Sequence, residues 1–352
     1  MPRVWGGPRW GSCFIDSWFA RDSGHTFSLS RRSALRPSRR DILIATRKSR
    51  LAMVQAEAVG KYVNRLNPRV GMRLVPIESE ADRTEGPLAP HGGKGLFTRA
   101  IERALLSKQA DIAVHSLKDL PTEGTPGLIL AATPKRAAVE DVLIARDADR
   151  IADLPRGGTV GTSSPRRAAQ VLRLRSDLKI VHLRGNVETR IAKVMENGEI
   201  DATILAAAGL NRLGLSEHLK KIIPVEDMLP AAAQGALGIQ CRVDDHVTLR
   251  RCMPLNDAIT SIRVNAERQV VAKLKADCFS PLAVLAEPIG LDELRLRARV
   301  LSLDGSEMAE ADVTAAVDRI AALSSEVTQI LLDQGARKLL DDAGKAMMAA
   351  KA

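Results

Sequence analysis

From residue 41 onward the chain alternates short apolar runs with longer amphipathic stretches. Four largely apolar runs are typical of strands buried in a sheet, at 42–45, 72–77, 112–114 and 128–132. Between them, 51–66 and 92–105 carry apolar residues at helical spacing, and Tyr62 is expected on the inward face of the first helix. This alternation predicts a mostly parallel sheet with helices on both faces.

A second α/β unit is predicted to begin after Pro134–Arg136. Ser164 and Asn186 are good N-caps, so each predicts a helix that starts directly after a strand. The small residues 206–209 are expected to form a turn. Four apolar runs predict the strands of this region, at 160–162, 180–183, 202–205 and 234–239.

The pattern changes again after Asp257. It predicts a helix over 259–275, a β-hairpin that turns at Asp304 and Gly305, and a terminal helix through 320–331. The predicted fold class is therefore α/β, with two α/β units followed by a smaller α+β unit.

Composition narrows the possible functions. Residues 1–40 hold eight arginines and two aspartates, more than half of the net charge of +10, and show no apolar period. We interpret them as a disordered extension, either an organelle transit peptide or an extension without structure. The body has three aromatic residues, too few for a base-stacking surface, so no nucleic acid is expected as a partner. Nucleic-acid binding through the basic leader is the alternative.

No apolar run approaches the length of a membrane span, so we expect a soluble protein without a membrane partner. The four cysteines form no Cys-x-x-Cys pair and have no histidine at metal-ligand spacing. This argues against a disulfide scaffold or a metal site and favours the cytoplasm, a reducing compartment. Cys241 and Cys252 fit a core position, whereas Cys278 lies in a loop-like break.

The stretch from Asp111 to Pro121 concentrates polar chemistry. An apolar strand leads into Ser116, Lys118 and Asp119, and Pro121 is expected to prevent a helix there. Ligands of open α/β sheets bind beyond the carboxyl ends of the strands. Asp119 is therefore the candidate reacting carboxylate, able to stabilise a developing positive charge and to move protons. A loop carboxylate that only pairs with Lys118 is the alternative.

Cations recur at four predicted helix starts. Ser164 and Pro165 open a helix whose first turn contains Arg166 and Arg167. Of the other three starts, one carries Arg47 beside Ser49, one carries Lys94, and one carries Arg184 and Arg190. The helix dipole disfavours cations there, but free amides and cations together bind anions. We therefore expect a ligand with several carboxylates or phosphates; cations that point into solvent are the alternative. Nucleotide-binding glycine motifs are absent from the sequence.

Six ordered motifs resemble those of the porphobilinogen deaminase family, at 44–49, 92–97, 111–121, 161–167, 183–190 and 208–214. The resemblance implies three domains, two that resemble the lobes of periplasmic binding proteins and a third that carries a cysteine on a loop. The expected boundaries are 41–136 with 234–254 for domain 1, 137–233 for domain 2 and 255–352 for domain 3.

The resemblance also implies a transferase, expected as a monomer without a metal. Members of this family hold a dipyrromethane cofactor by a thioether, here at Cys278. They add four porphobilinogen units to it head to tail, with loss of ammonia, and hydrolysis then frees hydroxymethylbilane. Asp119 matches the family's catalytic aspartate. Implied cofactor-binding residues are Ser116, Lys118, Thr162, Ser164, Arg166, Arg167, Arg184 and Gln234. Implied substrate-binding residues are Arg47, Ser49, Gln55, Lys94, Arg190 and Arg212.

Two positions depart from the family pattern. Pro90 stands where many members have lysine, so one contact is either missing or supplied by His91. Asp277 stands where a glycine typically precedes the cofactor cysteine. A neighbouring carboxylate disfavours the thiolate, so Asp277→Gly is expected to speed cofactor attachment. The alternative function is a non-catalytic, two-lobed protein that binds polycarboxylate anions.

Overall fold

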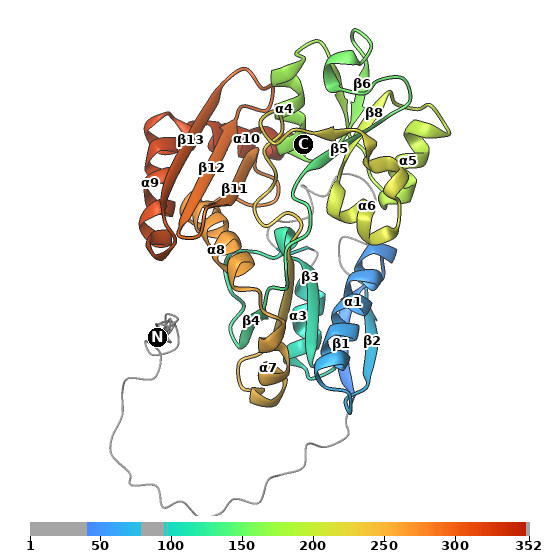
Figure 1. The fold of residues 1–352 in the computed structure, drawn as a ribbon. Helices are drawn as coiled ribbons and strands as arrows, with labels where there is room; N and C mark the ends of the chain where they lie inside the picture. Colours follow the sequence, from blue (N-terminus) through green and yellow to red (C-terminus); the bar gives the residue numbers. More distant parts are fainter. Residues whose placement is uncertain (1–40, 79–94, 97, 350–352) are drawn as a thin grey trace, which may run out of the picture. The chain divides into compact units, whose positions relative to one another are not determined.

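The computed structural model describes residues 41–78, 95–96 and 98–349, which belong to one compact unit. Three sheets, each with its own helices, form this unit (Figure 1). Pro90, His91 and Lys94 lie outside the described residues, so the expectations for them stay predictions. Among the described helices, none is long and apolar enough to cross a membrane.

The first sheet has five strands and one reversed member. Their order is β2 (Met72–Ile77), β1 (Ile42–Arg47), β3 (Ile112–Ser116), β10 (Leu237–Arg242) and β4 (Leu128–Ala132). β10 runs antiparallel to both of its neighbours, while the other four strands share a direction. The prediction of a mostly parallel sheet is thus confirmed. The strand predicted at 234–239 begins only at Leu237.

The helices beside this sheet are α1 (Arg50–Leu66), α3 (Arg99–Leu106) and α7 (His246–Cys252). Ser49 caps α1 by accepting a hydrogen bond from the Ala52 amide. The inward position predicted for Tyr62 is wrong, because its side chain is 53% exposed. The buried stripe runs through Ala56, Val59 and Val63, and Tyr62 lies roughly a quarter of a turn beside it.

The second sheet repeats this plan. Its order is β7 (Lys179–Val181), β6 (Thr159–Gly161), β8 (Ala202–Ala206), β5 (Asp141–Ala145) and β9 (Ile222–Ile223), with β5 reversed. The predicted caps Ser164 and Asn186 open α4 (Pro165–Leu174) and α5 (Val187–Met195). The turn predicted at 206–209 is wrong. Alanines favour helix, and α6 (Ala207–Leu213) starts directly after β8.

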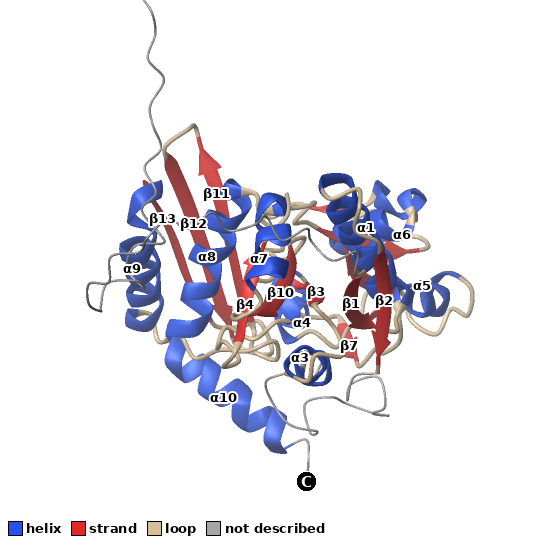
Figure 2. Ribbon diagram, turned by 90° about the horizontal axis from the view of Figure 1, so that it is seen from below, coloured by secondary structure: helices blue, strands red, loops and turns tan. Residues whose placement is uncertain are grey.

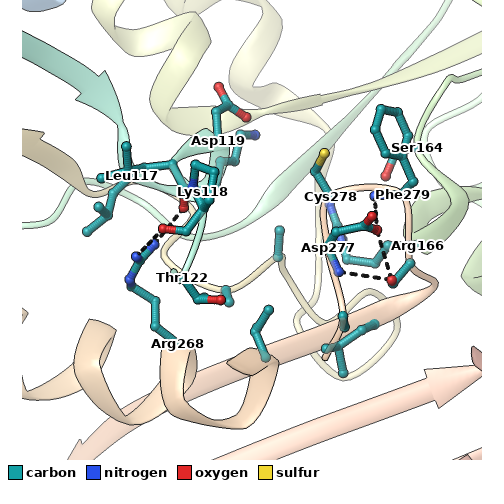
Figure 3. Close-up of a pocket in the computed structure, with 18 of the residues that line it drawn as sticks. Leu117, Lys118, Asp119, Thr122, Ser164, Arg166, Arg268, Asp277, Cys278 and Phe279 are labelled. Atoms are coloured by element: carbon teal, nitrogen blue, oxygen red, sulfur yellow. Dashed lines mark hydrogen bonds between the residues drawn. The ribbon is translucent and has the colours of Figure 1, made fainter. Parts of the chain in front are cut away.

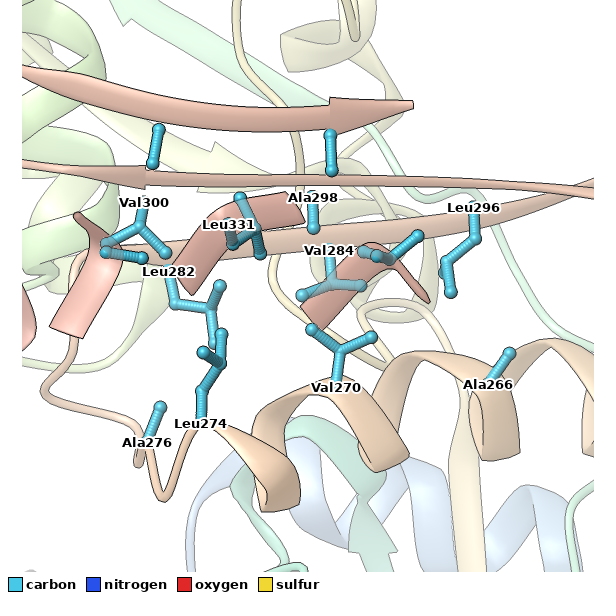
Figure 4. Close-up of a cluster of buried hydrophobic side chains, with 14 of the residues drawn as sticks. Ala266, Val270, Leu274, Ala276, Leu282, Val284, Leu296, Ala298, Val300 and Leu331 are labelled. Atoms are coloured by element: carbon cyan, nitrogen blue, oxygen red, sulfur yellow. The ribbon is translucent and has the colours of Figure 1, made fainter. Parts of the chain in front are cut away.

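The third sheet is antiparallel, with β11 (Leu282–Ile289), β12 (Glu293–Leu301) and β13 (Met308–Ala316). Two helices, α8 (Ala258–Lys273) and α9 (Ile320–Asp333), contribute to its core, and Figure 2 shows them beside the strands. Val270, Val284, Leu296 and Leu331 all belong to this buried cluster (Figure 4). The predicted turn at Asp304 is confirmed, whereas α10 (Ala336–Ala349) was not predicted.

The three sheets take their strands from 42–132 with 237–242, from 141–223 and from 282–316. The three sheets and their helices confirm the predicted α/β class with a third, smaller α+β unit. The domain boundaries between the sheets stay predictions. Two backbone crossings join the first sheet to the second, one before β5 and one before β10, and both lie close to the site described next.

Candidate functional site

A cavity of about 290 Å³ lies where three segments meet. One is the turn 117–122 that follows β3, the second is 163–167 at the start of α4, and the third is the loop 276–280 before β11. Figure 3 shows the side chains of Asp119 and Cys278 projecting toward the space between these segments. Residues far apart in the sequence are thus brought together around one cavity.

The turn that carries Asp119 has a short helical form. Leu117–Asp119 is one turn of 3-10 helix, so the prediction that Pro121 would prevent any helix here is wrong. Pro121 has no N–H to donate, but it lies beyond the end of this short helix, so it does not interrupt the helix's hydrogen bonds. The Leu117 side chain is fully buried and its amide donates to the carbonyl of Ala236. The turn is therefore anchored beside its two polar residues.

Lys118 is held in the protein rather than in solvent. Its Nζ donates to Oε1 of Gln234 at 3.2 Å. Burial, together with the neighbouring Arg167, lowers the pKa of Lys118 to about 8, although Asp119 and Asp141 act in the opposite direction. Lys118 is thus a cation whose charge depends on pH close to neutrality.

Arg166 and Arg167 at the start of α4 are both buried, with 4% and 7% of their surface exposed. Both donate to the carboxylate of Asp141, at 2.8 and 2.6 Å. Burial alone would raise the pKa of Asp141, but the two guanidinium groups hold it well below its usual range. The charges of these two arginines are therefore already partly neutralised by Asp141, and the alternative that they point into solvent is wrong.

Asp141 was missed by the sequence reasoning. It also accepts a hydrogen bond from Nε2 of Gln234 at 3.0 Å, so one carboxylate joins the α4 arginines to the residue that binds Lys118. Its sequence signal is weak, because Asp141 simply follows Glu140 in a polar pair before an apolar run. An acidic residue that opens an apolar strand, as Asp141 opens β5, was the available hint.

The loop with Cys278 holds itself together. Oδ1 of Asp277 accepts hydrogen bonds from the Phe279 amide and from the Ser280 hydroxyl, at 2.9 and 3.0 Å. Cys278 is exposed, unlike the buried Cys241 and Cys252. The surrounding protein and the charges of Asp277 and Asp119 raise the pKa of the Cys278 thiol to about 12. The thiol is presented to the cavity in its neutral form.

Two further predicted residues, Ser164 and Arg190, also line the cavity. Burial, Arg167 and Arg184 lower the pKa of Arg190 to about 10. Eight predicted residues are outside the lining: Arg47, Ser49, Gln55, Ser116, Thr162, Arg184, Arg212 and Gln234. Lys94 lies outside the described residues.

Several of these eight form hydrogen bonds next to the cavity lining or within the segments that continue from it. Ser116, directly before the turn, hydrogen-bonds Gln55. Thr162 accepts from the Ser164 amide, and Arg212 donates to the carbonyl of Gly235 at 2.7 Å. Arg268, which lines the cavity from α8, was not predicted.

Comparison with known proteins identifies the family. The sequence model described as "Porphobilinogen deaminase, dipyromethane cofactor binding domain" matches residues 42–250, and that of the "Porphobilinogen deaminase, C-terminal domain" matches 261–333. The porphobilinogen deaminase of Syntrophotalea carbinolica is 43% identical over 298 residues, which cover 84% of this chain and 94% of that protein. The chain belongs to the porphobilinogen deaminase family.

A second relative agrees with this membership. The porphobilinogen deaminase of Legionella pneumophila strain Lens is 42% identical over 300 residues, or 85% of this chain and 97% of that protein. Among solved structures, the methionine-binding protein MetQ is 12% identical, covers 62% of this chain and 89% of its own, and has a TM-score of 0.41.

The cavity fits the cofactor that the family model names. Arg167 Nε is buried without a hydrogen-bond partner among the described residues, so one donor is available beside the cavity. A carboxylate is the acceptor that a guanidinium binds best. Lys118 and Arg190 add positive charge, and the exposed thiol of Cys278 supplies a group for covalent attachment. These features suit a polycarboxylate pyrrole ligand.

Proposed function

We propose that the protein is a hydroxymethylbilane synthase, a transferase that joins four porphobilinogen molecules head to tail with loss of ammonia and releases hydroxymethylbilane. The observation that carries the proposal is the position of Asp119 and Cys278 on one cavity with several cations around it. The alternative of a non-catalytic anion-binding protein requires neither the carboxylate nor the thiol.

In this proposal Cys278 holds a dipyrromethane by a thioether. When bound, that cofactor supplies the electron-rich pyrrole that serves as the primer of the growing chain. Lys118, Arg166 and Arg167 are proposed to bind its carboxylates, with Ser164 at the start of α4 as a hydrogen-bonding partner. The unpartnered Nε of Arg167 supports this role. Ser116, Thr162, Arg184 and Gln234 are proposed to support the same site.

Asp119 is proposed as the catalytic carboxylate. Loss of ammonia from the aminomethyl group of porphobilinogen leaves positive charge on the substrate, and a carboxylate at the cavity wall stabilises that charge electrostatically. The same group is placed to receive or return protons as the new bond forms. Arg47, Ser49, Gln55, Lys94, Arg190 and Arg212 are proposed to bind the substrate's carboxylates, and Arg190 is the member of this set that lines the described cavity.

Intact-protein mass spectrometry of the purified chain tests the anchor. The parent is expected to carry the mass of two linked pyrrole units, and Cys278→Ser is expected to lack it. A parent without this mass, even after incubation with porphobilinogen or preformed hydroxymethylbilane, would favour the binding-protein alternative.

Turnover of porphobilinogen tests the catalytic role of the Asp119 carboxylate. With cofactor loaded, Asp119→Asn is expected to lower kcat by about 10²–10⁴-fold, the usual contribution of a general acid or base. Asp245→Asn serves as a control, because Asp245 caps α7 away from the cavity lining. Equal losses of kcat in the two variants would contradict the role of Asp119.

We further propose that the protein acts as a monomer in the cytoplasm. The resemblance to the family implies a monomer, and the described cysteines are free thiols, as a reducing compartment favours. A mass of one chain in light scattering, unchanged by added porphobilinogen, is the expected result.

A further inference from the structure

Arg268 belongs to α8, a helix of the third unit, yet its guanidinium group binds the first unit. Nη1 donates to the carbonyl of Leu120 and Nη2 to the carbonyl of Pro121, each at 2.7 Å. Figure 3 shows this two-pronged contact beside Lys118 and Asp119. A planar guanidinium that donates two hydrogen bonds fixes orientation as well as distance.

The two carbonyls follow Asp119 directly in the chain. On its N-terminal side the same turn is held by the hydrogen bond from the Leu117 amide to Ala236. Asp119 therefore lies between two anchors, one on each side. Without the second anchor, the end of this turn would depend on local backbone hydrogen bonds, such as that from the Leu120 amide to the carbonyl of Leu117.

The helix that carries Arg268 also leads to the cysteine loop. α8 ends at Lys273, and the Ala276 amide donates back to the carbonyl of Val271, which sets the chain's exit toward Cys278. One rigid helix thus contacts the Asp119 turn through Arg268 and determines where the Cys278 loop begins.

The environment of Arg268 fits a structural contact with the turn. Its side chain is partly buried, and burial lowers its pKa. No carboxylate among the described residues forms a salt bridge with it, so its identified partners are the two carbonyl groups. A cation kept from water at this position is stabilised mainly by the turn that it binds.

We propose that Arg268 is a positioning residue, which sets the place of the Asp119 carboxylate relative to the Cys278 sulfur by clamping the Asp119 turn to α8. The catalytic role of Asp119 and the anchoring role of Cys278, the two groups that this clamp positions, rest on the proposed function. The clamp itself rests on the two hydrogen bonds and the course of α8.

Arg263 provides a matched control. It lies on the same helix, is partly buried, and donates from Nε to the carbonyl of Ala286 at 2.8 Å. That acceptor is in β11, within the third unit. Arg263→Met therefore removes a buried arginine and a carbonyl contact from α8 without touching the Asp119 turn.

Hydrogen–deuterium exchange of the purified full chain tests the clamp independently of catalysis. In Arg268→Met the amides of 117–120 are expected to exchange at least about tenfold faster, the effect of losing hydrogen bonds to a charged donor. In Arg263→Met these amides are expected to exchange as in the parent. Equal exchange of this segment in both variants would overturn the clamp.

Kinetic measurements on the cofactor-loaded protein test the effect of the clamp on catalysis. Arg268→Met is expected to lower kcat with little change in KM. Arg268→Lys, which keeps the charge but lacks the planar pair of donors, is expected to recover part of the loss. A raised KM with unchanged kcat would instead show that Arg268 binds substrate directly and would overturn the proposal. If the parent itself neither loads nor turns over, the proposed function fails, while the exchange measurement still decides the clamp.

Discussion

The two sides of the cavity are held in different ways. The Asp119 turn is anchored by partners distant in the sequence, namely Gln234 on Lys118, Ala236 on Leu117 and Arg268 on its last carbonyls. The Cys278 loop is closed by its own residues, through the hydrogen bonds of Asp277 with Phe279 and Ser280. One side is therefore set by tertiary structure and the other by local sequence.

This difference separates the effects of substitutions. A change at a distant anchor of the turn is expected to alter both stability and the cavity, because the anchors also join the sheets. A change within the cysteine loop is expected to alter the thiol's reactivity and little else. The following predictions test that separation.

The largest effect is expected at Asp141, which joins the α4 arginines to Gln234 and so to Lys118. Asp141→Asn leaves two buried guanidinium groups without their carboxylate, and breaking a buried ion pair costs about 3–5 kcal/mol of unfolding free energy. Urea unfolding measures this loss. As a control, Asp153→Asn removes the exposed partner of Arg150 and is expected to leave the midpoint unchanged. Equal midpoints for the two variants would contradict the prediction.

The same carboxylate predicts a dependence of stability on pH. Its folded-state pKa is lowered below the unfolded value of about 4, so the carboxylate stabilises the fold above that pH and the contribution disappears as the pH falls below it. In Asp141→Asn, the free energy of unfolding measured in urea is expected to lack this part of its decrease at acid pH.

An intermediate effect is expected for Lys118. Because its pKa is about 8 without ligand, its charge is lost as the pH rises through that value, and carboxylate ligands are then bound less tightly. The Kd for preformed hydroxymethylbilane, measured in a cofactor-free Cys278→Ser background, is expected to rise about tenfold between pH 7 and 9, the effect of one lost charge-assisted contact. In Lys118→Arg, which stays charged, this rise is expected to disappear.

Lys221 offers the control for that measurement. Its Nζ donates to the carbonyls of Ala145 and Ala148, away from the cavity lining. Lys221→Arg should keep the pH profile of this Kd that is seen without the substitution. An alkaline rise that persists in Lys118→Arg would assign the titration to another group.

Features governed by neighbouring residues were predictable from the sequence. Caps such as Ser164 and Asn186 and the buried strands were located because their signals are local. The loop position of Cys278 and the Asp119 turn were recognised for the same reason, aided by the family motifs.

Features that depend on distant contacts were not predictable in this way. No pattern near Arg268 indicates that it binds Leu120 and Pro121, which are well over one hundred residues away along the chain. Likewise, nothing beside Arg166 shows that its charge is met by Asp141. Such pairings follow only from how the sheets are placed together.

The smallest effect is expected within the cysteine loop, at Asp277. Although part of Cys278 is exposed to the cavity, the loss of solvent to the protein around it is the largest cause of its raised pKa, and the charge of Asp277 comes second. Asp277→Gly removes this charge but also the acceptor that binds Phe279 and Ser280, whereas Asp277→Asn removes the charge and retains an amide oxygen in the same place. Attachment of the cofactor is therefore expected to be fastest in Asp277→Asn, intermediate in Asp277→Gly and slowest in the parent.

The expected gain in Asp277→Asn is about threefold, because a tenfold increase in thiolate per pKa unit is partly offset by the lower nucleophilicity of a weaker base. The rate is measured as the mass gain of cofactor-free protein after addition of preformed hydroxymethylbilane. Asp304→Asn, in a similar turn remote from the cavity, is the control and should match the parent. Faster attachment in Asp277→Gly than in Asp277→Asn would contradict this order. It would mean that the hydrogen bonds of Asp277 with Phe279 and Ser280 slow the attachment of the cofactor.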